Sequence, residues 1–147
     1  MRAERSLESI AGVRAPIHAN ALAIMALAAR RLDVMGRNMQ IATEARSYYD
    51  DARANADGKH DDVVERDLNI TKYLLWEQRD MMLDLVPLVK RAWEYENRPS
   101  HELSVLERYH IAAQLAIERA DKFALVASKY AAGNPLPSFD EVLTEGR

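Results

Sequence analysis

The fold is decided by the stretch Leu74-Leu75-Trp76-Glu77-Gln78-Arg79-Asp80-Met81-Met82, where a pair of adjacent apolar residues recurs after seven positions. One heptad row contains Leu68, Leu75, Met82 and Val89, and its neighbour contains Leu74, Met81, Leu88 and Tyr95. Two adjacent rows make an apolar face about 100° wide, as a helix in a bundle needs. The stretch therefore predicts a long helix with one broad buried face.

This helix has predicted ends. Asp62 is placed to cap its start, and Glu65, three residues later, completes a capping box. Pro87 removes one backbone donor, but the apolar pattern continues to Trp93, so we expect a kink rather than an end.

A first long helix is predicted upstream, from Pro16 or Ile17 to about Ala54. The part from residue 21 to 29 is apolar nearly all round, so we expect it to be buried on several sides or covered by a partner. Gly36 predicts a close crossing with another helix, because glycine costs a helix about 1 kcal/mol relative to alanine. Beyond residue 31 the predicted buried stripe is Leu32, Met35 or Gly36, Met39, Ala42 and Ala45 or Arg46.

A third long helix is predicted between a cap at Ser100 and a stop at Gly133-Asn134-Pro135. So many alanines on its inner face predict a close neighbour, either another helix of this chain or one of a second copy. Next, Pro137 to Leu143 predicts a short capped turn, docked by Phe139 and Leu143. The predicted inner row of the third helix is Leu103, Leu106, His110, Ala113, Ile117, Ala120, Ala124 and Ala127.

The predicted fold class is all-α, an antiparallel bundle of three long helices with short terminal helical pieces. Residues 1–16 form an N-terminal arm or short helix, residues 17–132 the bundle, and residues 133–147 a C-terminal turn and tail. No stretch has the alternating pattern of a strand.

Composition narrows the function classes. The chain has 147 residues, 48% hydrophobic and 29% charged, and its net charge of −3 gives no electrostatic case for nucleic acid. The absence of cysteine excludes disulfides, thiolate metal sites and cysteine nucleophiles. We expect no membrane span, no cofactor and a cytoplasmic location by default, with the location open if the chain is a fragment of a secreted protein.

A metal site is a weak alternative. Glu107 and His110 have the Glu-x-x-His spacing of di-iron bundles, and His110 is on the predicted inner row. Such a site requires a second copy of the motif and further inward glutamates, and the second helix has no Glu-x-x-His. We therefore expect His110 to be a buried, hydrogen-bonded histidine.

The junction between the second and third helices concentrates polar and aromatic residues. Trp93, Glu96, Asn97 and Arg98 are the candidate binding residues there. Positive charge and hydrogen-bond donors are favoured at a helix C-terminus, so a rigid corner is the first interpretation. The alternative is a polar patch that binds a ligand or a neighbouring domain.

The same junction carries a family resemblance. Trp93-Glu94-Tyr95-Glu96-Asn97-Arg98-Pro99, followed by Val105-Leu106-Glu107-Arg108-Tyr109, resembles the helical region after the catalytic barrel in bacterial family 20 glycoside hydrolases. The resemblance implies a helical accessory domain that shapes a sugar site or makes a dimer. The barrel, which needs about 200 residues, is missing from this chain, so no catalytic residue is predicted.

The leading functional hypothesis is a non-catalytic helical accessory or interaction domain that self-associates. Its expected partner is a second copy, or a neighbouring catalytic domain if the chain belongs to a longer glycoside hydrolase. One alternative is a saccharide-contacting fragment of a carbohydrate-active enzyme, and another is the metal-binding bundle.

Overall fold

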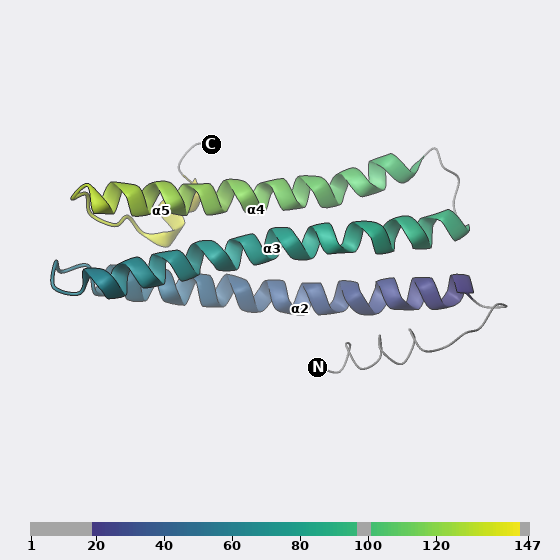
Figure 1. Ribbon diagram of the computed structural model, residues 1–147, viewed down its shortest axis with the longest axis horizontal. Helices are drawn as coiled ribbons and strands as arrows, with labels where there is room; N and C mark the ends of the chain where they lie inside the picture. Colours follow the sequence, from purple (N-terminus) through teal and green to yellow (C-terminus); the bar gives the residue numbers. More distant parts are fainter. Residues whose placement is uncertain (1–18, 97–100, 145–147) are drawn as a thin grey trace. The chain divides into compact units, whose positions relative to one another are not determined.

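The computed structural model describes residues 19–96 and 101–144. Its elements are all α-helices: α2 (Ala19–Ala54), α3 (Asp61–Glu96), α4 (Glu102–Ala131) and the short α5 (Phe139–Thr144), shown in Figure 1. The prediction of an all-α chain with three long helices and a short terminal one is confirmed. The predicted arm, residues 1–16, lies outside the described residues.

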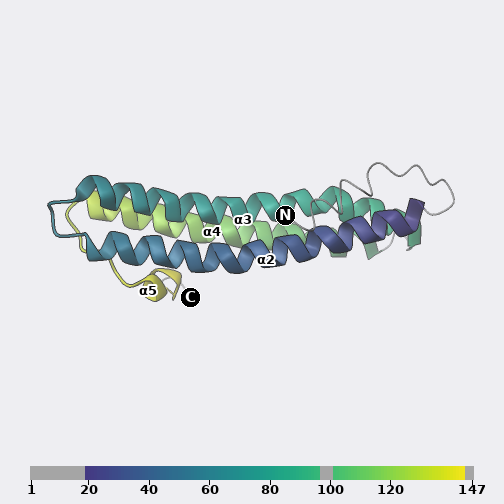
Figure 2. The same ribbon diagram turned by 90° about the horizontal axis from the view of Figure 1, so that it is seen from below.

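The described chain forms two compact units, and each long helix contributes to both. The first unit combines residues 19–38 with 80–96 and 101–113, and the second combines residues 39–79 with 114–144. Within the second unit, the segments of α2, α3 and α4 lie side by side with α5 against them, as Figures 1 and 2 both show.

The second unit is organised around three aromatic rings. Tyr49 of α2 packs edge-on against Phe123 of α4 at 5.1 Å between centroids and against Phe139 of α5 at 5.7 Å. Phe123 and Phe139 are 5.1 Å apart, so the three rings close a triangle. The Tyr49 hydroxyl donates a hydrogen bond to the Pro137 carbonyl at 3.0 Å, and burial raises the pKa of Tyr49 to about 12.

A buried hydroxyl connects α2 to α3 in the same unit. Thr71 is fully buried, and its hydroxyl lies 2.9 Å from the Asp67 carbonyl of its own helix and 3.4 Å from the Ala45 carbonyl of α2. The carboxylate of Asp67 is also buried and accepts a hydrogen bond from the Arg66 side chain at 2.9 Å. These polar groups are therefore satisfied inside an otherwise apolar core.

Helix α5 is held by a capping box and by two long-range contacts. The Ser138 amide donates to the Glu141 carboxylate at 2.6 Å, and the Glu141 amide donates to the Ser138 hydroxyl at 3.3 Å. Arg46 of α2 forms a two-point ion pair with Asp140, and Lys122 of α4 donates to the Leu143 carbonyl at 2.9 Å. The predicted capped turn is confirmed, and Phe139 is buried as expected. The second buried residue is Val142, while Leu143, which was predicted in that role, is only half-buried.

Acid should weaken the attachment of α5. The ion pair with Arg46 lowers the pKa of Asp140, and the hydrogen bonds from Ser138 lower the pKa of Glu141. Since both values are lowered, their stabilisation is present above an ordinary pKa of about 4 and is lost as pH falls through the lowered values. Urea unfolding at about pH 7 and about pH 2.5 should show the loss.

The matched comparison uses one double variant and one control. Asp140→Asn with Glu141→Gln should reduce the difference between the two pH values. Asp121→Asn, which changes an exposed carboxylate of α4, should leave it unchanged. A full acid response in the double variant would contradict the assignment.

The helix ends agree with the sequence prediction at one place and differ from it at another, and the predicted cap at Ser100 lies outside the described residues. Gly133 has φ of 88°, and the Asn134 amide returns to the Lys129 carbonyl at 3.1 Å, so α4 ends in a glycine cap as predicted. The predicted cap of α3 is wrong, because the helix begins at Asp61. The His60 carbonyl accepts the first helical hydrogen bond, from Val64 at 3.0 Å, and Asp62 lies inside the first turn.

Among the described residues, the first unit has the smaller buried set, and an ion pair joins two of its helices. Arg30 of α2 lies 3.7 Å from Asp84 of α3 and 3.5 Å from Asp33 of its own helix. Helix α3 continues through Pro87, as the apolar pattern predicts. The buried hydrophobic residues of this unit are Val34, Met81, Leu85, Val89, Ala92 and Ala113.

Two predicted faces are partly wrong. Ala113 and Ala120 of α4 and Ala45 of α2 are buried as predicted. On α4, Leu103 and His110 are exposed, and the buried row is Ala113, Ala116, Ala120, Phe123 and Val126, which includes the one phenylalanine of the helix. On α2, the predicted stripe is exposed at Leu32, Met35 and Met39. The buried row is instead Val34, Ile41, Ala45, Tyr49 and Ala52.

Candidate functional site

The predicted corner is only partly described. Trp93 is half-buried near the end of α3, and Glu96 is the last residue of that helix. Nothing is described of the Glu96 side chain, and Asn97 and Arg98 lie outside the described residues. The prediction that these four residues form a binding patch therefore stays a prediction.

The two metal candidates lie on the surface of α4. Glu107 and His110 are both exposed, so the prediction of a buried histidine is wrong. The buried row of α4 contains Ala113, Ala116 and Ala120, and position 110 lies outside it. Over residues 19–96 and 101–144, no group of three or more histidine, aspartate or glutamate side chains could hold a metal ion.

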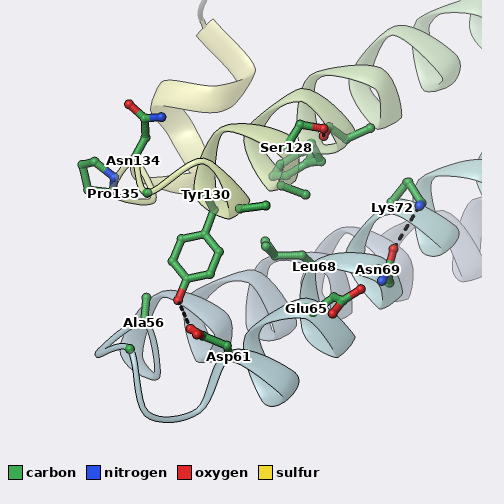
Figure 3. Close-up of a pocket in the computed structure, with 16 residues that line it drawn as sticks. Ala56, Asp61, Glu65, Leu68, Asn69, Lys72, Ser128, Tyr130, Asn134 and Pro135 are labelled. Atoms are coloured by element: carbon green, nitrogen blue, oxygen red, sulfur yellow. Dashed lines mark hydrogen bonds between the residues drawn. The ribbon is translucent and has the colours of Figure 1, made fainter.

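A pocket of about 920 Å³ lies in the second unit, between the first half of α3 and the second half of α4. Its volume is within the range of roughly 300–1,000 Å³ that small-molecule sites occupy. Buried Leu68 and Phe123 form part of its floor, together with Ala124 and Ala127 of α4. Figure 3 shows the pocket with Leu68 between the two helices.

One end of the pocket is acidic. Asp61 and Glu65 line it from successive turns of α3. The Tyr130 hydroxyl donates to the Asp61 carboxylate at 2.8 Å, a hydrogen bond that raises the pKa of Tyr130 (Figure 3). Glu65 is exposed and has no hydrogen-bond or ion-pair partner among the residues that the structure describes.

The other end is cationic and continues into an aromatic surface. Lys72 lines the pocket, and its ammonium donates to the Asn69 side chain at 3.0 Å (Figure 3). The same ammonium lies 5.1 Å from the ring centroid of Tyr73 and 5.4 Å from that of Trp76. The two rings meet edge-on at 5.4 Å, and Arg79 lies 5.8 Å from the Trp76 ring.

None of these pocket residues was predicted as a site. A signal existed in the spacing, because positions 61, 65, 69, 72 and 76 recur at three or four residues and bring polar side chains to one face of α3. That face is opposed by the small residues Ala124, Ala127 and Ser128. Ala124 and Ala127 were on the predicted inner row of α4, but no prediction paired them with the polar face of α3.

Comparisons with known proteins add no relative. The chain matches no family model, no curated protein and no solved structure. The resemblance to the helical region of family 20 glycoside hydrolases therefore stays a prediction from residues 93–109. Among the described helices, none is long and apolar enough to cross a membrane.

Proposed function

We propose that this chain is a non-catalytic helical interaction domain that associates with a second copy of itself through α2. The observation that carries the proposal is an exposed apolar stripe in the first unit, formed by Met25, Leu32, Met35 and Gly36. Met25 is 56% exposed, Leu32 65% and Met35 58%. Their spacing places them on one side of the helix, with exposed Ala28 between them.

Gly36 supports a helix partner. A Cβ atom added at this glycine would meet nothing within 4 Å, so its own chain, as described, gives no packing reason for a glycine inside α2. The residue costs the helix about 1 kcal/mol relative to alanine. A helix from another molecule that crosses closely at this position would explain the glycine, because a side chain there would keep the two helices apart.

A second copy is the partner that the stripe suits best. Most homo-oligomers are two-fold symmetric, and the same patch then faces itself, so an uncharged stripe is its own complement. Methionine side chains adapt their shape to such a surface. Arg31 at the edge of the stripe is exposed, and its charge decides whether the two α2 helices pair parallel or antiparallel.

The orientation is antiparallel. In a parallel pair, the two Arg31 side chains would lie side by side and repel each other. In an antiparallel pair crossing at Gly36, they are ten residues apart along the helix axis, about 15 Å. This separation exceeds the screening length of about 8–10 Å at physiological salt.

Sedimentation at increasing concentration tests the proposal. The wild-type chain should change from monomer to dimer, and Leu32→Glu with Met35→Glu should remain monomeric, because two charges would be desolvated in the pair. The control is Leu115→Glu on α4, another exposed leucine, which should still dimerise. A wild-type chain that stays monomeric at high concentration would overturn the proposal.

Gly36→Leu separates association from folding in the same experiment. A Cβ atom at position 36 meets nothing within 4 Å, the position is exposed, and leucine favours a helix more than glycine, so thermal unfolding should show a monomer at least as stable as wild type. The close crossing would be blocked, and the dimer should be lost. A Gly36→Leu chain that dimerises normally would show that α2 does not cross its partner there.

A further inference from the structure

We infer that the pocket between α3 and α4 binds a short peptide with free termini, with the peptide ammonium at Glu65 and the peptide carboxylate at Lys72. The assignment goes beyond self-association and concerns a surface of the second unit. It depends on the charges at the two ends of the pocket, the distance between them and the small side chains on the floor.

The acidic end selects a cation. Glu65 carries a carboxylate without a partner in the described structure, and Asp61 one turn earlier adds a second negative group. Tyr130 occupies only one lone pair of Asp61, so its carboxylate can accept another hydrogen bond. A peptide ammonium brings three donors to these two acids.

The opposite end selects an anion. Lys72 uses one of its three N–H donors on Asn69, and two remain for a carboxylate. The rings of Tyr73 and Trp76 hold the ammonium in place without neutralising it. Arg79 follows Trp76 by three residues on α3 and lies 5.8 Å from its ring, so it adds a second positive charge to the same aromatic surface.

The distance between the two ends sets the length of the ligand. Glu65 and Lys72 are seven residues apart on α3, which corresponds to about 10 Å along the helix axis. Three residues of extended peptide span about 10 Å. A tripeptide therefore places its two charged termini at the two ends at once.

The floor sets the kind of side chain. Ala124 and Ala127 present only methyl groups, and Leu68 adds a buried apolar surface beside them. Small side chains let a peptide backbone approach closely, and they give apolar contact without competing hydrogen bonds. Peptides with small apolar residues are therefore the expected class, with Ala-Ala-Ala as the simplest probe.

Calorimetric titration of the whole chain with three peptides tests the inference. Ala-Ala-Ala should bind saturably with a Kd of about 1 mM or lower. N-acetylation and C-terminal amidation should each weaken binding about tenfold, because each removes a charge-assisted contact. No binding of Ala-Ala-Ala up to about 10 mM, or equal binding of all three peptides, overturns the inference.

Two pocket variants assign the termini. Glu65→Gln should abolish the difference between free and acetylated peptide and keep the effect of amidation. Lys72→Met should do the reverse. Glu107→Gln and Lys90→Met, which change exposed charges of the first unit, serve as matched controls and should bind like wild type. Pocket variants with wild-type discrimination, measured at wild-type helicity, would show that the peptide binds elsewhere.

Discussion

Replacing Phe123 with alanine is expected to lower the free energy of unfolding by about 3–5 kcal/mol. Phe123 is almost completely buried, and its ring is the one that α4 contributes to the triangle with Tyr49 and Phe139. Its removal leaves a cavity surrounded by α2, α4 and α5, and it also removes two aromatic contacts. Urea or thermal unfolding, followed by circular dichroism, gives the measurement.

The control for this prediction keeps the volume more nearly constant. Phe123→Leu leaves an apolar side chain in place and should cost less than half as much as Phe123→Ala. Leu125→Ala, two positions along the same helix and mostly exposed, should cost less than about 1 kcal/mol. If Phe123→Ala were as mild as Leu125→Ala, the ring triangle would not be the core of the second unit.

Leu85→Ala is expected to lower the free energy of unfolding by about 2–5 kcal/mol. Leu85 is 2% exposed and belongs to the small buried set of the first unit. Because that set has few large side chains, the lost apolar contact is not easily replaced by its neighbours. The measurement is again the free energy of unfolding.

Leu83→Ala is the matched control, since it makes the same change two residues away on the same helix. Leu83 is 39% exposed, so its truncation removes much less buried surface and should cost less than about 1 kcal/mol. Equal costs for the two leucines would mean that the buried face of α3 in this unit has been assigned wrongly.

The buried face of a helix was predicted correctly where its apolar residues lie on one side only. On α3 the two adjacent heptad rows are apolar. Leu68, Leu75, Met81 and Val89 are buried as expected, while Met82 and Leu88 are half-buried. On α2 apolar residues lie on both sides of the helix. Periodicity could not separate Leu32 and Met35 from the row through Val34, and only packing against α3 decides between them.

Only one side of the candidate site, the polar face of α3, was predictable from the sequence. The polar residues of α3 share a helical face, which the sequence contains, but a pocket also requires the opposing face of α4. Burying the ring of Phe123 gains more than burying an alanine, so the buried row of α4 includes Phe123, while Ala124 and Ala127 are only half-buried. A method that weighted side-chain size above spacing would have placed His110 outside and Ala116 inside.

The capping box of α5 has a consequence for the order of folding. A helix of six residues does not form alone in water, because nucleation costs more than its few hydrogen bonds return. Its attachment through Arg46 and Asp140 closes a segment of 94 residues, and it needs both α2 and α4 to be in place first. We therefore expect α5 to form last during refolding and to be the first helix whose amide protons exchange with solvent.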